Sequence, residues 1–153
     1  MLLDDRYFLC PSPTLLSPIL SLRPFAQWSC TIKSKVDSTW NLHSLLPHNL
    51  DFFILLSSLA GVYGSTSQCN YSAGNTFQDA LAKFRMKSGF SGSSIAVDLG
   101  WMHDVGIIAE RKEYRRHREK VGDMGAVYAA DLLALLDHSC GPGQSPPNCA
   151  QES

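Results

Sequence analysis

The sequence lacks the patterns that place a protein in a membrane, on nucleic acid or outside the cell. No apolar run reaches the ~20 residues that a transmembrane helix needs. There is no block of basic residues, and 13 Lys and Arg residues against 14 Asp and Glu residues give a formal net charge of −1. The first residues are acidic and prolines interrupt those that follow, unlike a signal peptide. We therefore expect a cytoplasmic protein that binds neither nucleic acid nor membranes.

Cysteine and histidine show no arrangement that would build a metal site or a disulfide framework. The five cysteines are odd in number and include no CxxC pair. The five histidines have no metal-binding spacing such as HExxH. The sequence therefore predicts reduced intracellular thiols and no bound metal.

The most informative stretch is residues 51–75, which predicts a buried strand that leads through a loop into a helix. Residues 52–56 are apolar on both faces, as expected for a parallel strand that helices cover on both sides. Ser57 and Ser58 follow this strand, and a helix over 69–88 begins after a loop rich in small residues. Open α/β sheets bind ligands at the carboxyl ends of their strands, so these serines mark a candidate site.

The other predicted elements alternate between helices and strands. An amphipathic helix is predicted over 28–46, a second strand at 95–99, a charged helix at 110–120 and an amphipathic helix at about 126–137. The predicted buried face of the 28–46 helix is Ile32, Val36, Thr39, Trp40 and His43, and that of the 69–88 helix is Tyr71, Gly74, Asn75, Gln78, Leu81, Ala82 and Arg85. This order is typical of an α/β fold with a parallel sheet, of which two strands make only half.

Composition divides the chain into four segments. Residues 1–10 are short and mixed, and we interpret them as a remnant strand or loop. Residues 11–27 hold four of the eight prolines, too closely spaced for an ordinary helix, and predict an irregular insertion. Residues 28–138 contain the predicted helices and strands, and residues 139–153 have the composition of a disordered tail.

Hydroxyl groups near the end of the first strand suggest a site for a carbonyl group. Ser58 lies thirteen residues before Tyr71, and Asn75 shares a helix face with that tyrosine. Two hydroxyls can bind one carbonyl oxygen, and a tyrosine can donate its proton as a hydride reaches the carbon. A free tyrosine has a pKa of ~10 and needs a nearby cation, for which Lys33 and Lys35 are the candidates. Ordinary packing explains the same pattern, and the spacing alone leaves both interpretations open.

The residues around this site resemble a known family. The stretch FFILLSSLAGVYGSTSQCNYSAGNTFQDALAKFR is similar to the ketoreductase domain of polyketide synthases, particularly the fungal reducing type, within the short-chain dehydrogenase/reductase superfamily. The similarity continues through KSKVDSTWNLHSLL, through SIAVDLGWMHDVGIIAE and to about Leu136. It implies a partial Rossmann-like, three-layer α/β fold in which residues 28–138 are the C-terminal half of the domain and the N-terminal half is missing.

The resemblance also implies a role for each candidate catalytic residue. Ser58 would bind the carbonyl, Tyr71 would donate the proton, and Asn75 with Lys35 would sustain the tyrosine through a proton relay. Lys33 would then be a solvated neighbour. A general short-chain dehydrogenase is the alternative at the level of the family, and it is disfavoured because Asn75, not a lysine, follows the tyrosine by four positions.

Two further groups of residues match the family's pattern less specifically. Gly100 and Trp101 follow the second strand, where the superfamily lines the nicotinamide side of the cofactor pocket, and packing in the core is the alternative for Trp101. Leu3, Asp4 and Asp5 resemble a Leu-Asp-Asp motif beside the substrate, and an ordinary acidic turn is the alternative.

The function that the resemblance implies is NADPH-dependent reduction of a β-keto thioester to a β-hydroxy thioester, on a carrier-protein-bound polyketide, in secondary metabolism. The GxGxxG turn that holds a dinucleotide pyrophosphate is absent, and the GVYG sequence at 61–64 follows the wrong strand. A catalytically silent remnant or an interaction module is therefore the alternative, and we do not expect the isolated chain to be active. The apolar edge of a partial sheet also predicts self-association.

Overall fold

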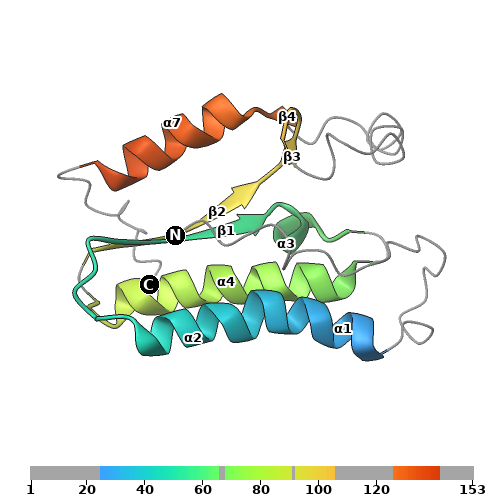
Figure 1. Cartoon of the computed structure of the whole chain (residues 1–153), viewed down its shortest axis with the longest axis horizontal. Helices are drawn as coiled ribbons and strands as arrows, with labels where there is room; N and C mark the ends of the chain where they lie inside the picture. The colour runs from blue at the N-terminus through green and yellow to red at the C-terminus, as the bar shows by residue number, and fades with distance from the viewer. Residues whose placement is uncertain (1–24, 66–67, 91, 106–125, 142–153) are drawn as a thin grey trace, which may run out of the picture.

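The computed structural model describes residues 25–65, 68–90, 92–105 and 126–141. Its elements are α1 (Phe25–Ile32), η3 (Lys33–Asp37), α2 (Ser38–Leu45), β1 (Phe52–Ser58), α3 (Ala60–Tyr63), α4 (Cys69–Lys87), β2 (Ser93–Leu99), β3 (Trp101–Met102), β4 (Ala126–Val127) and α7 (Ala129–Cys140). Figure 1 shows α2 and α4 side by side on one side of the β1–β2 pair, with α7 on the other side. The predicted α/β fold, with parallel strands and flanking helices, is confirmed.

Residues 25–45 form one continuous helical rod, in which the π-helical segment η3 joins α1 to α2. Ile32 and Ser38, which flank η3, keep right-handed helical backbone angles, so the rod does not break there. The rod begins at Phe25, three residues before the predicted start and within the segment that we expected to be irregular. It ends at Leu46, whose backbone is extended because a residue before proline avoids the helical region.

The rod packs with a polar stripe rather than with its most apolar residues. Lys35, Thr39 and His43 are buried, whereas Trp40 is 49% exposed. The predicted face, which included Trp40, is therefore wrong in part. The buried side chains make hydrogen bonds to α4, and a search for hydrophobic periodicity does not detect such a face.

Helix α4 agrees with its predicted bounds and with its predicted buried face. It ends at Lys87, two residues before Gly89, which has a left-handed backbone with φ of 74°. Its buried residues are Asn70, Gly74, Asn75, Gln78, Leu81, Ala82 and Arg85. Two residues depart from the prediction: Tyr71 is half-buried at the edge of this face, and Asn70, which we did not predict, is buried.

Gly74 sets the distance between α4 and the rod. A Cβ atom built at Gly74 would lie 2.8 Å from Cβ of Lys35, closer than carbon atoms can approach without a shift of the backbone. Glycine therefore allows the two helices to meet at the level of Lys35.

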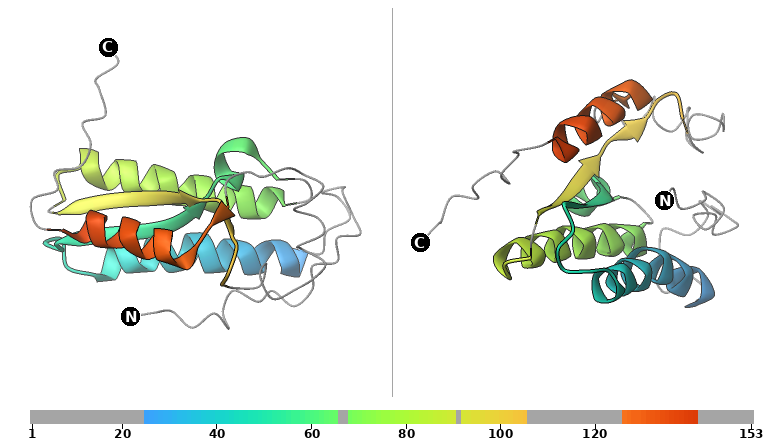
Figure 2. Two further views of the ribbon diagram at one scale, coloured as in Figure 1. Left: turned by 90° about the horizontal axis from the view of Figure 1, so that it is seen from above. Right: turned by 60° about the vertical axis from the view of Figure 1, so that its left-hand side comes forward.

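Strands β1 and β2 pair in parallel along their whole length, from Phe52 opposite Ser93 to Ser58 opposite Leu99. Helix α4 connects them and packs on one face of the pair, and the core there is formed by Phe53, Leu55, Leu81 and Ala82. The two views in Figure 2 show the same arrangement from above and from the side. Gly92 allows the turn into β2, since any side chain there would collide with the backbone at Leu50.

The opposite face of β1 is largely open within the described residues. Phe52 is 48% exposed and Leu56 is 43% exposed, although both are large and apolar. The expectation that helices cover both faces of this strand is therefore wrong for the part of the chain that the structure describes. An apolar run predicts that both faces of a strand can be buried, but it does not predict which elements cover them.

The last described elements are short β3 and β4, which pair in parallel, followed by α7. We predicted a helix from about residue 126, but Ala126 and Val127 form β4 instead. The helix starts at Ala129, whose backbone N–H donates to Asp104 at 2.9 Å, and Asp131 accepts from the Tyr128 N–H at 3.1 Å. These carboxylates satisfy N–H groups at the start of the helix and so fix its beginning.

Several predictions concern residues outside the described ranges. These are the segment 1–24, including the Leu3, Asp4 and Asp5 motif, the charged helix at 110–120, and the tail beyond residue 141. Of the helices that the structure describes, none is both long enough and apolar enough to cross a membrane.

Candidate active site

The carboxyl ends of β1 and β2 form one edge of the sheet, and the candidate residues gather there. Ser58 is the last residue of β1 and lies opposite Leu99, the last residue of β2. The Leu59 N–H donates to the Leu99 carbonyl at 3.0 Å, which holds the two strand ends together. Gly100 and Trp101 come directly after β2 and are half-buried, so they lie at the edge where the sequence placed them.

Lys35 points into the interior from the π-helical segment of the rod. It is 3% exposed. Its Nζ atom donates to the Leu56 carbonyl at 2.8 Å and to Oε1 of Gln78 at 3.0 Å. The same atom lies 5.4 Å from the centroid of the Tyr71 ring. Lys33 is exposed, so of the two candidate cations it is Lys35 that lies beside the tyrosine.

The proton affinity of Lys35 is reduced by its surroundings. Burial lowers the pKa of its ammonium from 10.5 to about 8, and the Asp79 carboxylate opposes this change. Removal from water disfavours the charged form, and a nearby negative charge favours it. An amine with this pKa exchanges its proton near neutral pH, which suits a group that takes part in proton transfer.

Asn75 is fully buried and connects three parts of the site. Its Nδ2 atom donates to the Tyr71 carbonyl at 2.9 Å, and its own backbone carbonyl accepts from the Ser57 hydroxyl at 3.3 Å. Its Oδ1 atom is buried and has no hydrogen-bond partner among the described residues. A buried acceptor of this kind is usually satisfied by a bound molecule such as water.

The Ser58 hydroxyl accepts one hydrogen bond within the loop and can still donate another. Its Oγ atom accepts from the Ala60 N–H at 3.2 Å, at the start of α3. A hydroxyl that accepts one hydrogen bond still has its own proton to donate. Among the contacts of the described residues, none joins Ser58 to Tyr71, so their association rests on their common position at the end of β1.

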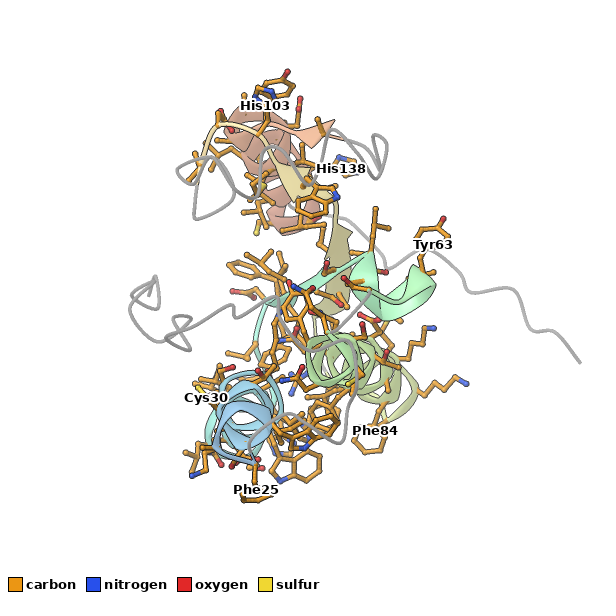
Figure 3. All side chains as sticks on the ribbon, turned by 90° about the vertical axis from the view of Figure 1, so that its right-hand side faces the viewer. Phe25, Cys30, Tyr63, Phe84, His103 and His138 are labelled. Atoms are coloured by element: carbon orange, nitrogen blue, oxygen red, sulfur yellow. The ribbon has the colours of Figure 1, made fainter. Side chains whose placement is uncertain are left out.

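The loop after β1 is not a phosphate-binding turn. Residues 60–63 form α3, in which Tyr63 is 72% exposed and projects outward, as Figure 3 shows. A Cβ atom at Gly61 would lie 3.1 Å from Cβ of Asn75, so this glycine serves the packing of α3 on α4. The sequence analysis likewise noted that the GVYG sequence at 61–64 follows the wrong strand for a dinucleotide-binding turn.

Two residues near the site, Gln78 and Asp79, were not among the candidate site residues predicted from the sequence. Gln78 contacts Lys35, and Asp79 is half-buried. Ser57, which the sequence did mark, is buried and donates to the backbone of α4. Burial raises the pKa of the Asp79 carboxyl, and the nearby Ser57 hydroxyl opposes this change. Gln78 belonged to the predicted buried face of α4, and a polar residue on such a face was the available signal.

The comparisons with known proteins agree on one family. The KR-domain family matches residues 17–103 of the chain. Highly reducing polyketide synthase 2 of Gibberella zeae is 52% identical over 118 residues, which are 77% of this chain and 4% of the synthase. Squalestatin tetraketide synthase of Phoma sp. is 43% identical over 113 residues, which are 73% of this chain and 4% of that synthase. The chain thus spans only a small fraction of the length of these relatives.

Solved ketoreductases have the same arrangement of elements. The ketoreductase from the first module of phoslactomycin biosynthesis in Streptomyces sp. HK803 superimposes with a TM-score of 0.68 at 25% identity, over 80% of this chain and 28% of that one. An A1-type ketoreductase gives a TM-score of 0.67 at 30% identity, over 76% of this chain and 24% of that one. The chain therefore belongs to the KR-domain family and corresponds to part of the ketoreductase domain of fungal highly reducing polyketide synthases.

Proposed function

We propose that this chain forms the catalytic part of an NADPH-dependent ketoreductase, which reduces a β-keto thioester on a carrier-bound polyketide to a β-hydroxy thioester. The observation that carries this proposal is the position of Lys35. Its buried ammonium is held at the carboxyl end of β1 and lies 5.4 Å from the centroid of the Tyr71 ring. A cation beside this ring can stabilise the negative charge that forms on the tyrosine oxygen as its proton is donated.

Each residue then has a distinct task. The Ser58 hydroxyl, which keeps its proton free, donates a hydrogen bond to the substrate carbonyl oxygen. The Tyr71 hydroxyl donates its proton to the same oxygen as negative charge develops there. Lys35 stabilises the resulting phenolate, and Asn75 supports the return of a proton to Tyr71 through its unpaired Oδ1 atom.

The residues present fit the reactive end of the cofactor. When bound, NADPH supplies a hydride to the carbonyl carbon. Gly100 and Trp101 lie at the same sheet edge as Ser58 and would line the nicotinamide side. The described residues offer no glycine-rich turn for the pyrophosphate, since Gly61 is used in packing. The rest of the cofactor would have to be held by other parts of a complete domain.

A silent remnant or an interaction module is the second candidate, and a specific observation favours it. The open face of β1 exposes Phe52 and Leu56 in the described part of the chain. An apolar face of this kind suits contact with another polypeptide, and it needs no catalysis.

Binding and activity distinguish the two candidates. We expect the isolated chain to bind NADPH weakly, and co-expression with the N-terminal half of a related ketoreductase domain to restore reduction of a β-keto thioester. Tyr71→Phe should then reduce kcat by at least ~100-fold, because general acid catalysis contributes about that much. Tyr63→Phe is the matched control, since Tyr63 is exposed on α3. A completed domain that binds NADPH but retains full activity in Tyr71→Phe would rule out the proposed role of Tyr71.

A further inference from the structure

The amide of Gln78 bridges the rod and α4 at the level of Lys35. Its Oε1 atom accepts from Nζ of Lys35 at 3.0 Å, and its Nε2 atom donates to Oγ1 of Thr39 at 3.1 Å. All three side chains are buried, with exposures of 3% for Lys35, 7% for Gln78 and 4% for Thr39. Both ends of the amide are therefore used, inside the protein, between residues that are far apart in the sequence.

The chemistry of these groups fixes which way the amide points. An ammonium has only donors, so it must face the amide oxygen. The amide NH2 group then faces Thr39, which lies four residues after Lys35 on the same stripe of the rod. An apolar residue at position 78 would fill the same space but would leave a buried ammonium without this acceptor, which is costly. A polar residue at position 78 therefore stabilises the buried ammonium of Lys35.

Two anchors from different elements restrict the flexible side chain of Lys35. The Leu56 carbonyl belongs to β1 and the Gln78 amide to α4. Among the described residues, α4 contributes two titratable groups near Lys35: the Tyr71 ring lies near its ammonium, and the Asp79 carboxylate acts on it through its charge. β1 contributes a neutral carbonyl. Gln78 is thus a neutral group that directs the ammonium without adding charge.

We propose that Gln78 is a positioning residue that holds the Lys35 ammonium beside Tyr71 at the carboxyl end of β1. Its importance for catalysis rests on the proposed function, in which Lys35 serves Tyr71. Its effect on Lys35 itself does not depend on activity and is measurable in the chain without cofactor or substrate.

The test follows the titration of the Lys35 side chain by NMR in the full chain, with the resonance assigned from Lys35→Arg. Gln78→Glu places a carboxylate at the ammonium and should raise the pKa of Lys35 by about one to three, as an adjacent opposite charge does. Gln78→Met removes the acceptor and should lower that pKa. Gln68→Glu is the matched control, because it adds the same charge to the exposed residue that precedes α4, and should leave the titration unchanged.

The outcomes separate this proposal from the proposed function. An unchanged titration of Lys35 in folded Gln78→Glu protein would overturn the positioning role. If Gln78→Met fails to fold, Thr39→Val provides the second variant, since it frees the amide NH2 and should also lower the pKa of Lys35. In an active, completed domain the alkaline limb of the kcat profile, where Lys35 loses its charge, should move with the pKa of Lys35 while KM stays constant. If the pKa of Lys35 changes but the pH dependence of kcat does not, the positioning role of Gln78 is supported and the catalytic role of Lys35 is contradicted.

Discussion

Two buried cationic side chains, Lys35 and Arg85, distinguish the interior of this protein at the scale of single residues. Arg85 is 1% exposed, and it donates to Ser94 at 3.0 Å and is 2.9 Å from Nδ1 of His43. Its guanidinium lies 4.1 Å from the centroid of the Phe53 ring. Both cations are held by neutral acceptors, so their surroundings make the stability of the fold dependent on pH.

Lys35 should make the folded protein more stable as the pH rises above 8. The pKa is 10.5 in the unfolded chain and about 8 in the folded one, so between these values the unfolded chain binds more protons. The cost of burying the charge is full below pH 8 and is lost as the pH approaches 10.5. The gain is at most about 3.5 kcal/mol, since a tenfold change in proton affinity is worth about 1.4 kcal/mol. Urea unfolding at several alkaline pH values measures it, and Lys35→Met should remove the rise that wild type shows.

His43 should destabilise the protein in acid. Its pKa is lowered, first by burial and then by the charges of Arg85 and His48. The unfolded chain therefore takes up the proton more readily, and stability that is present above a pH of ~6.5 falls as the pH decreases.

Urea unfolding between pH 7.5 and pH 5.5 tests this prediction. His43→Asn retains an acceptor for Arg85 without a titrating ring and should flatten the dependence. His138→Asn is the control, because His138 is exposed on α7, where Figure 3 shows it far from the rod. An equal acid loss in wild type and His43→Asn would refute the role of His43.

The sequence predicted much of the site at this scale, but it did not predict how the residues are linked. Lys35 and Lys33 were both candidates, since helical periodicity does not fix the phase of a helix that contains a π-helical segment. The Gln78 contact joins residues 43 positions apart, and no local pattern reports such a pair.

At the scale of elements, α4 and the rod approach each other closely at Gly74. We expect Gly74→Ala to reduce the free energy of unfolding by about 1–3 kcal/mol, the usual cost of overpacking, because its Cβ would meet Lys35. The higher helix propensity of alanine, worth about 1 kcal/mol, opposes this loss. Chemical denaturation measures the net effect, and an unchanged or higher stability would show that the helices move apart without cost.

Helix α4 was predicted better than the rod, although both bury polar side chains where they meet. Helix α4 was placed almost to the residue, because its periodic face is long and Gly89 ends it. A helix was predicted where the rod lies, but Trp40 was assigned to the buried face. That face of the rod is instead formed by Lys35, Thr39 and His43. The start of α7 was missed because Ala126 and Val127 pair with a strand that follows β2 directly.

At the scale of the whole molecule, the open face of β1 should drive self-association. Phe52 and Leu56 are large, apolar and about half exposed, and they lie on the same face of the strand, on either side of the half-buried Ile54. Light scattering over a range of protein concentrations should show oligomers or aggregates, and a monodisperse monomer would count against this prediction. Leu56→Lys should reduce the association, whereas Leu45→Lys, at a residue that is 82% exposed on α2, should not.

The π-helical segment has a consequence for how the chain can vary in length. Each turn of such a segment holds one residue more than a turn of α-helix. The rod can therefore lose a residue at 33–37 by changing this turn to α-helix, while α2 keeps its contacts with α4. A deletion there would alter the direction in which α1 leaves the domain, while Thr39 and His43 stay in register with α4.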